Sequence, residues 1–319
     1  MKAAVRRNYG NQEAIFIENL NKPIPKEDEV IVQVKANTVN RTDCANLTGE
    51  PFIMKLMLGY SSPSKIIIGT DFSGVVMESG FLAGNFKKGD RVFGFYDMGL
   101  ESQAEFVCVK KDYLLPIPDS IDFKQAVAGL EGAHYAYSFI HYVDIQPGQK
   151  VLINGATGAI GSALLQFSRQ FDIEITATCN TENIDLIKKL GADKIIDFTK
   201  EDFTKTEESY DYIFDSVGKS TFGACKPILK EKGIYISSEL GPKAENIFYS
   251  LASKFRKNKK VVFPIPFSQK KTMPYIINLL KSGKFKPVID REYPLSEISE
   301  AYKYVLSGNK TGNVIINHD

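Results

Sequence analysis

The stretch VLINGATGAIGSALLQ, residues 151–166, runs from an apolar strand pattern through a glycine-rich turn into a helical pattern. Gly155, Gly158 and Gly161 recur at three-residue spacing. Such glycines let a strand turn sharply, let the backbone approach a pyrophosphate, and let the helix pack closely on the strand. The helix N-terminus then offers N–H groups and partial positive charge to phosphates. The stretch predicts a dinucleotide-binding loop, and the alternative is a tight turn that merely needs glycine.

The sequence around this loop alternates between apolar strands and helical segments from about residue 122. The expected strands are 151–155, 174–179, 194–197, 210–215, 233–238 and 261–265, and the expected helices include 162–170, 184–190 and 222–229. Near-continuous apolar strands separated by helices are typical of a parallel sheet covered on both faces. We therefore expect a doubly wound α/β domain over residues 122–264.

The sequence before this domain has a different pattern. Residues 29–39, 66–78, 90–95 and 104–110 are predicted strands, and the proline-containing connector LPIPD (115–119) follows them. Residues 1–121 therefore form the first part of a mainly β domain. Residues 265–319 hold helices at 273–281 and 296–306 and a closing strand at 313–317. Because a single terminal strand is not stable alone, we expect this segment to return to the first domain.

Composition and charge exclude several classes of function. The chain has 319 residues, 40 Lys and Arg, 38 Asp and Glu, and a net charge of +2, which disfavours a nucleic-acid binder. The basic run 254–260 is then expected to be a solvated face. Four scattered cysteines and three histidines form neither a CxxC pair nor an HExxH motif, so a transition-metal site is not expected. The absence of a signal-peptide or membrane-span pattern predicts a soluble cytoplasmic protein that does not bind membranes.

The residue type at the end of the second strand distinguishes NADP(H) from NAD(H). About 20 positions after the glycine turn the chain reads Cys179, Asn180, Thr181, Glu182, Asn183. No acid ends the strand at Cys179 to bind a ribose 2′-hydroxyl, and the uncharged donors Asn180 and Thr181 favour NADP(H). NAD(H) stays open, because residues 180–183 also fit a simple turn and helix cap.

Motifs along the whole chain resemble the medium-chain dehydrogenase/reductase superfamily, specifically its zinc-independent quinone oxidoreductase-like branch. They are MKAAV (1–5), NRTDCANLTG (40–49), GTDFSGVV (69–76), KKGDRVFGF (87–95), NGATGAIGSALLQ (154–166), LGADKIID (190–197), FDSVGKS (214–220) and KTGNVII (310–316). The resemblance implies a GroES-like catalytic domain with an inserted Rossmann domain, a nicotinamide cofactor in the cleft between them, and a homodimer.

One departure from related enzymes concerns zinc. Where zinc alcohol dehydrogenases carry Cys, His and Glu, this chain carries Asn40, Thr70 and Asp71, and the structural zinc lobe has no counterpart. A catalytic zinc needs about three N or S ligands from the protein. The resemblance therefore implies a cofactor site without zinc.

The resemblance also places candidate catalytic residues. Thr42 matches a hydroxyl position near the nicotinamide, although a threonine there can simply cap a backbone group. Glu131 and His134 lie three residues apart in an expected helix and could supply the proton that accompanies hydride transfer, with His134 titrating near working pH. A packed, hydrogen-bonded histidine is the alternative. Tyr60 is a further candidate donor, or else an aromatic residue of a lid.

The expected cofactor contacts come from several segments. Arg41 matches a pyrophosphate-binding position, and Lys310 is a candidate partner of the 2′-phosphate. The complete set is Asn40, Arg41, Gly155, Ala156, Thr157, Gly158, Ala159, Ile160, Gly161, Cys179, Asn180, Thr181, Asn183, Ser216, Val217, Gly218, Ser238 and Lys310. The resemblance, together with these residues, implies an NADPH-dependent reductase of a quinone or an activated enone or carbonyl. The alternatives are an NAD(P)-dependent alcohol or aldehyde dehydrogenase and a non-catalytic NADPH-binding protein of the crystallin type.

Overall fold

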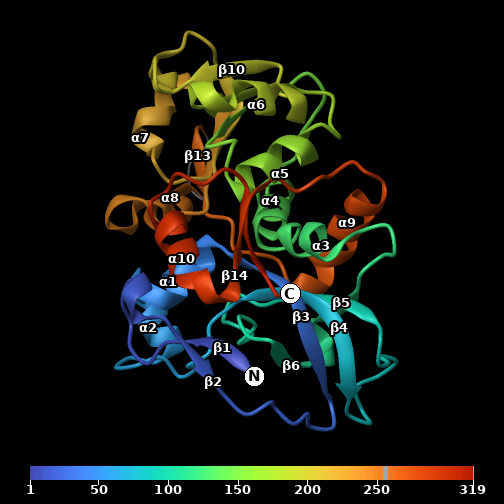
Figure 1. Cartoon of the computed structure of the whole chain (residues 1–319). Helices are drawn as coiled ribbons and strands as arrows, with labels where there is room; N and C mark the ends of the chain where they lie inside the picture. Colours follow the sequence, from blue (N-terminus) through green and yellow to red (C-terminus); the bar gives the residue numbers. More distant parts are fainter. Residues whose placement is uncertain (254–257, 319) are drawn as a thin grey trace. The chain divides into compact units, whose positions relative to one another are not determined.

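The computed structural model describes residues 1–253 and 258–318, and these residues fall into two compact units (Figure 1). Unit 1 comprises Met1–Glu131 and Lys286–Asp319, and unit 2 comprises Gly132–Phe285. Each unit is described separately below. Residues 254–257 of the basic run singled out in the sequence lie outside the described residues.

The unit boundaries differ from the predicted positions near residues 121 and 264 because of helix packing. The helix α3 (Phe123–Ala128) belongs to unit 1, where the Phe123 carbonyl accepts a hydrogen bond from Ser73 Oγ at 2.7 Å. The helix α9 (Gln269–Lys281) belongs to unit 2, where the Tyr275 ring packs edge-on against Phe167, with centroids 5.5 Å apart. Each helix therefore belongs to the unit whose residues it contacts.

Unit 2 is built on a six-stranded parallel sheet of order β10-β9-β8-β11-β12-β13. This is the strand order of a classic Rossmann sheet, in which the first strand is central and the order reverses beside it. The strands are β8 (Lys150–Asn154), β9 (Glu174–Cys179), β10 (Lys194–Asp197), β11 (Tyr210–Asp215), β12 (Leu229–Ser237) and β13 (Lys260–Val262). The predicted doubly wound sheet is confirmed.

The helices of unit 2 precede, connect or follow these strands. They are α4 (Glu131–His141), which begins at the last residue of unit 1, α5 (Ala159–Ser168), α6 (Ile184–Leu190), α7 (Phe222–Cys225), α8 (Glu245–Ser253) and α9. The central helix α5 is buried along nearly its whole length, which explains its apolar sequence. Figure 1 shows α6 beside β10 at the edge of the sheet.

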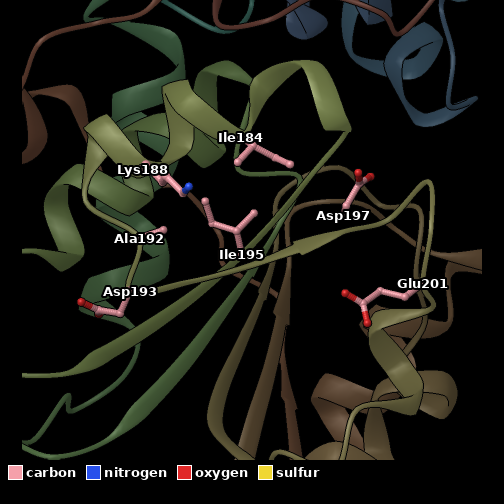
Figure 2. Close-up of a pocket in the computed structure, with 7 residues that line it drawn as sticks. All are labelled: Ile184, Lys188, Ala192, Asp193, Ile195, Asp197 and Glu201. Carbon is pink, nitrogen blue, oxygen red and sulfur yellow. The ribbon is translucent and has the colours of Figure 1, made fainter.

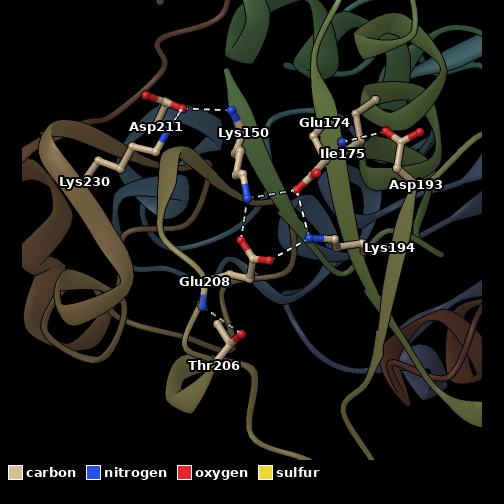
Figure 3. A network of polar contacts seen from close by, with 9 residues as sticks. All are labelled: Lys150, Glu174, Ile175, Asp193, Lys194, Thr206, Glu208, Asp211 and Lys230. Carbon is tan, nitrogen blue, oxygen red and sulfur yellow. Dashed lines mark hydrogen bonds and ion pairs between the residues drawn. The ribbon is translucent and has the colours of Figure 1, made fainter. Parts of the chain in front are cut away.

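Four charged side chains join neighbouring strands near the amino ends of this sheet (Figure 3). Lys150 Nζ lies 3.4 Å from Glu174 and 2.5 Å from Glu208, and Lys194 Nζ lies 3.2 Å and 2.6 Å from the same two carboxylates. The four groups therefore form a closed ring of alternating charge. Each side chain keeps roughly one third or more of its surface exposed, so water screens the ring.

Unit 1 contains a seven-stranded sheet and a two-stranded ribbon. The sheet has the order β14-β15-β3-β4-β5-β7, with β6 also paired to β3, and the ribbon joins β1 to β2. The strands are β1 (Lys2–Val5), β2 (Phe16–Asn19), β3 (Glu29–Val39), β4 (Asp71–Ser79), β5 (Arg91–Phe95), β6 (Phe106–Lys110), β7 (Leu114–Pro116), β14 (Ile289–Pro294) and β15 (Asn313–Asn317). The closing strand β15 pairs with β3, as predicted.

Two apolar cores stabilise unit 1. One lies among the strands and contains Val32, Phe72 and Val92. The other joins β15 to two helices through Leu47, Tyr302 and neighbouring side chains. The helices of unit 1, besides α3, are α1 (Arg41–Thr48), α2 (Ile53–Leu58) and α10 (Ile298–Leu306). The second core fixes α1, which carries several predicted site residues.

One predicted helix of unit 2 is shorter than the sequence suggested. The segment 222–229 is α-helical only over α7, a 3-10 turn (Lys226–Ile228) follows, and Leu229 begins β12. Pro227 lies in this turn and cannot donate a backbone hydrogen bond, so it favours an early end to the α-helix.

Candidate functional site

The glycine turn of unit 2 has the geometry expected of a phosphate-binding loop. Gly155 follows β8 with φ +79°, a conformation that favours glycine. A Cβ on Gly161 would lie 2.2 Å from the Gly155 carbonyl oxygen, so α5 can approach the turn only with glycine there. Gly158 is the N-cap of α5 and provides no capping side chain. The first N–H groups of α5 lack partners within the helix and are available to an anion.

A buried side-chain network supports this turn, and the sequence analysis did not identify it. Thr178 Oγ1 accepts from the Gly155 N–H at 3.0 Å and donates to Asn154 Oδ1 at 2.8 Å. Asn154 Nδ2 donates to Asp215 Oδ1 at 3.0 Å, and Tyr235 OH donates to Asp215 Oδ2 at 2.7 Å. The network thus joins the carboxyl ends of four strands. Burial raises the pKa of Asp215, and the hydrogen bonds that it accepts oppose that rise.

The Asp215 carboxylate also holds the next predicted cofactor loop. It accepts from the Val217 and Gly218 N–H groups at 3.3 and 3.0 Å, and Ser216 Oγ donates to the Asn154 carbonyl at 2.8 Å. The structure therefore brings residues 216–218 against the glycine turn. Residues 216–218 lie far from Asn154 in the sequence. The sequence could have indicated that they are close in space only through the predicted parallel sheet, in which the strands before them are neighbours.

Ser238 lies just beyond the carboxyl end of β12. Within the described part of the chain, its buried Oγ has no hydrogen-bond partner. In an open α/β sheet, ligands bind outside the carboxyl ends of the strands. This hydroxyl is therefore suited to receive a polar group of a ligand.

The predicted 2′-phosphate segment follows β9. Asn183 Nδ2 donates to Asn180 Oδ1 at 2.6 Å, and Cys179 is fully buried, where desolvation raises the pKa of its thiol to about 11. Thr181 Oγ1 donates to Asp197 Oδ2 at 2.5 Å. Hydrogen bonds from Thr181 and Thr199 keep the pKa of Asp197 below its usual range, so a negative charge adjoins the segment.

A cavity of about 340 Å³ lies beside this aspartate (Figure 2). Its charged lining residues are three acids, Asp193, Asp197 and Glu201, and one base, Lys188. An excess of negative charge disfavours a phosphate here. The lining of this cavity thus has one cation and three carboxylates.

In unit 1, Asn40 has a structural role at the start of α1. Its Oδ1 accepts from the Asp43 N–H at 2.8 Å, and Asp43 Oδ2 accepts from the Asn40 N–H at 3.1 Å, which forms a capping box. Its Nδ2 donates to Thr70 Oγ1 at 2.9 Å. Because only 2% of Asn40 is exposed, its side chain is not presented to a ligand in this structure.

The positions aligned with zinc ligands do not fit a metal ion. The Asp71 carboxylate accepts from the Thr38 N–H at 2.7 Å, from Thr38 Oγ1 at 2.5 Å and from Asn40 Nδ2 at 3.3 Å. Burial raises the pKa of Asp71 to about 7. Amide and hydroxyl donors surround the carboxylate, whereas zinc prefers thiolate, imidazole and free carboxylate ligands. Across residues 1–253 and 258–318, no group of three or more His, Cys, Asp or Glu could hold a metal ion.

Three predicted site residues of unit 1 meet around Glu131. Thr42 Oγ1 donates to Glu131 Oε1 at 3.0 Å, although the two residues lie 89 positions apart. Burial raises the pKa of Glu131, and the nearby Lys310 ammonium is the main influence that lowers it. Lys310 Nζ donates to the Gly312 carbonyl at 2.6 Å. Arg41, exposed at the start of α1, contributes further positive charge.

His134 differs from its predicted role. Its ring is 1% exposed, and Nδ1 lies 2.8 Å from Thr272 Oγ1 of α9. Desolvation lowers the pKa of His134 to about 4. The expectation that this histidine titrates near working pH is therefore wrong, because the buried ring is neutral at pH 7. His134 of α4 belongs to unit 2, whereas Glu131, the first residue of α4, belongs to unit 1 and contacts Thr42 of the same unit.

Tyr60 is separate from the Thr42–Glu131 pair in its contacts. It is 69% exposed, and its ring packs edge-on against Phe52, with centroids 6.1 Å apart. Among the described residues, no hydrogen bond joins Tyr60 to Thr42 or Glu131. The arrangement fits the alternative of an exposed aromatic residue better than that of a positioned donor.

Two family models match this chain. The model of the alcohol dehydrogenase GroES-like domain matches residues 26–119, and the model described as zinc-binding dehydrogenase matches residues 190–316. The segment matched by the second model does not include Asn40, Thr70 or Asp71.

Curated relatives match almost the whole chain. A chloroplastic NADPH-dependent alkenal/one oxidoreductase of Arabidopsis thaliana is 30% identical over 99% of this chain and 79% of the relative. A chloroplastic quinone-oxidoreductase homolog of Spinacia oleracea is 29% identical over 96% of this chain and 95% of the relative. The mitochondrial NAD(P)H oxidoreductase RTN4IP1 of Homo sapiens is 30% identical over 99% of this chain and 89% of the relative.

Solved structures share the fold. The quinone oxidoreductase from Coxiella burnetii has a TM-score of 0.87 at 24% identity and covers 100% of this chain and 99% of its own. The Escherichia coli quinone oxidoreductase complexed with NADPH has a TM-score of 0.84 at 20% identity and covers 100% of both chains.

The comparisons correct one prediction. The expected cytoplasmic location is contradicted, because the relatives named above are chloroplastic or mitochondrial proteins and point to an organelle. Among the described residues, no helix combines the length and the apolar character that a membrane crossing requires.

The glycine turn, the Rossmann strand order and the match to these relatives lead to one assignment. The chain belongs to the quinone oxidoreductase-like branch of the medium-chain dehydrogenase/reductase superfamily and is an NAD(P)H-dependent oxidoreductase.

Proposed function

We propose that this chain is a zinc-independent reductase that uses NADPH to reduce a quinone or an activated enone or carbonyl. NADPH-dependent reduction of a quinone or enone is the activity at the level of the family. The observation that carries the finer proposal is the hydrogen bond from Thr42 to Glu131, because it provides a route for a proton without a metal.

Each unit offers groups suited to cofactor phosphate: the glycine turn in unit 2, and the cations Arg41 and Lys310 in unit 1. The first N–H groups of α5, at residues 159–161, would bind the pyrophosphate, because the Gly158 N–H already donates to the Gly155 carbonyl. Arg41 would offer a planar guanidinium suited to phosphate. Lys310 lies in the same electrostatic neighbourhood as Arg41, which supports a pyrophosphate contact for Lys310 in place of the 2′-phosphate contact first expected. The other parts of the cofactor would be bordered by Ser216, Val217, Gly218 and Ser238. When bound, NADPH supplies a hydride from nicotinamide C4.

The preference for NADPH over NADH rests on Asn180 and Thr181. Both side chains are donors of hydrogen bonds, but Thr181 donates to the ionised Asp197. Discrimination by uncharged donors beside a carboxylate should be modest. We therefore expect NADPH to bind roughly tenfold more tightly than NADH, about 1.4 kcal/mol.

The protein's part in the chemistry is to orient the acceptor and to deliver a proton. Thr42 Oγ1 is the donor, and Glu131 is the group that holds and exchanges its proton. Asn40 and Asp71 fix α1 by hydrogen bonds and take no part in metal binding. His134 is a packing residue in this proposal.

The test mixes purified protein with NADPH or NADH and a panel of quinones, enones, aldehydes and ketones, with and without a chelator. Loss of NADPH absorbance that needs a quinone or enone and ignores the chelator would support the proposal. Activity that a chelator abolishes, or oxidation of an alcohol alone, would contradict it. NADPH binding without turnover of any acceptor would favour the non-catalytic alternative.

The predicted homodimer stays a prediction. In unit 2, β13 is the edge strand of the sheet, and such an edge can pair with a second copy. Light scattering after gel filtration should give a mass near 71 kDa, about twice the 35.6 kDa of one chain, and a mass near 36 kDa would contradict the prediction.

A further inference from the structure

Glu131 is a buried acid within a cluster of charged groups in unit 1. It is 5% exposed, at the first position of α4. Its electrostatic neighbours are the cations Arg41 and Lys310 and the acidic groups Asp43, Cys44 and Asp71. The cluster therefore balances two positive charges against carboxylates that burial makes costly to ionise.

The hydrogen bond between Thr42 and Glu131 has a direction that depends on this balance. An ionised carboxylate only accepts, so the single hydroxyl proton of Thr42 points to Glu131 Oε1 at 3.0 Å. In that state Thr42 cannot donate to a substrate. A protonated Glu131 would donate to Thr42 Oγ1 instead, and the hydroxyl proton would be free to point elsewhere.

The cations that favour ionised Glu131 are the ones assigned above to cofactor phosphate. Lys310 is the strongest influence that lowers the pKa of Glu131, and Arg41 acts in the same direction. Phosphate charge next to these cations would cancel their potential at Glu131. Burial is the largest influence on the pKa of Glu131 and favours the neutral acid, and the hydrogen bonds from Thr42 would then oppose it without the help of the two cations.

We propose that cofactor binding at Arg41 and Lys310 makes Glu131 take up a proton, so that Thr42 becomes a hydrogen-bond donor to the substrate only in the loaded enzyme. The inference rests on the proposed function.

The proton balance of one turnover follows. The acceptor gains two electrons and one hydrogen as hydride from NADPH. Thr42 gives its hydroxyl proton to the acceptor while Glu131 gives its own proton to Thr42 Oγ1. Glu131 is left as a carboxylate, and solvent supplies its next proton when new cofactor binds. The sum is NADPH, one proton and the acceptor going to NADP⁺ and the reduced acceptor.

Titration calorimetry with NADPH, in two buffers of equal pH and different ionisation enthalpy, measures protons taken up per cofactor bound. The proteins are the wild type, Glu131→Gln, and the control Glu300→Gln on the exposed face of α10. Glutamine still accepts from Thr42 but does not titrate. Subtracting the variant from the wild type removes any contribution from the cofactor's own 2′-phosphate.

We expect the wild type and Glu300→Gln to take up the same fraction of a proton, at most about one, and Glu131→Gln to take up less by that fraction. The difference should be largest at a pH between the pKa values of the free and loaded enzyme. Lys310→Met should also reduce the uptake, because Glu131 is then more protonated before binding.

The outcomes separate two failures. If NADPH binds to all proteins with equal proton uptake in the wild type and Glu131→Gln, the proton linkage is wrong while the proposed function stands. If no protein binds NADPH, the proposed function fails first. Thermal melting of Glu131→Gln within a few degrees of the wild type confirms that a folded variant was compared.

Discussion

In the proposed reduction, the Thr42 hydroxyl donates a proton to the acceptor. Replacing Thr42 should therefore reveal the proton-transfer step. We expect Thr42→Val to lower kcat by about 10²-fold, because valine keeps the shape and removes the hydroxyl. Thr42→Ser should recover most of the activity. NADPH affinity should change little in both. Initial rates with one quinone and one enone provide the measurement, and an unchanged kcat in Thr42→Val would exclude a role for the hydroxyl.

His134 should affect the pH dependence of stability more than that of activity. Its folded pKa of about 4 lies below the 6.5 of the unfolded chain, so the unfolded chain binds the proton more readily between these values. The stabilisation is complete above pH 6.5 and is lost as pH falls toward 4, by at most about 1.4 kcal/mol per pH unit.

Urea unfolding at pH 7, 6 and 5 measures this slope. His134→Gln should show a shallower decline than the wild type. His141→Gln is the matched control on the same helix, and its effect should be smaller because His141 is exposed. Equal slopes for the wild type and His134→Gln would contradict a neutral, buried imidazole.

The sequence could identify candidate site residues, but it could not identify the residues that they contact. The resemblance pointed to Thr42 and Glu131 separately, but their contact spans 89 positions and appears only in the folded unit. For His134, helical spacing could not tell a ring that faces a site from a ring that packs against Thr272. Asn40 was expected at the cofactor, whereas the capping box explains it, because a side chain at a helix start competes for local N–H groups.

The turn between β8 and α5 provides a matched pair of glycine substitutions. A Cβ on Gly158 would have the Gly155 carbonyl oxygen as its nearest neighbour at 3.6 Å, which is ordinary contact. A Cβ on Gly161 would lie 2.2 Å from the same atom. Gly158→Ala should therefore fold normally and bind NADPH at least about tenfold more weakly, because its methyl group faces the expected phosphate.

Gly161→Ala should lose both stability and binding. The forced separation of α5 from the turn is an overpacking cost of about 1–3 kcal/mol. Thermal melting and fluorescence titration of NADPH, applied to both variants, give the comparison. Equal stability losses in the two variants would mean that α5 does not pack on the turn as described.

Elements with strong patterning were predicted almost to the residue. The expected strands 174–179, 194–197 and 210–215 coincide with β9, β10 and β11. The predicted helix 222–229 is divided into α7 and a 3-10 turn, because Pro227 cannot donate the backbone hydrogen bond that would continue the α-helix. The network around Asp215 was missed because its members belong to four different strands.

At the scale of the whole molecule, the ring of ion pairs should contribute a pH-dependent part of stability. Lys150 and Lys194 lower the pKa of Glu208 to about 2. Because the folded pKa is depressed, the stabilisation is present above about pH 4.5 and is lost as pH falls toward 2. Glu208→Gln should lower Tm at pH 7 by about 1–2 °C, since exposed pairs are weak.

Differential scanning calorimetry of wild type and Glu208→Gln across pH 2.5–7 checks this expectation. The difference in Tm should shrink on acidification and on addition of 1 M salt. Glu300→Gln, which removes an isolated exposed pair with Lys303, is the control and should show a smaller difference. A difference that does not respond to pH would mean that Glu208 acts by packing and not by charge.

The strand order of unit 1 sets the sequence of events during synthesis on the ribosome. β3 is made early, and its residues Ala36–Val39 pair with β15, which is among the last residues to emerge. All of unit 2 is made between these two partners. The parallel sheet of unit 2 can therefore form before β15 is available to pair with β3. A nascent chain that stalls late in synthesis would leave this edge of β3 unpaired and exposed to incorrect strand pairing.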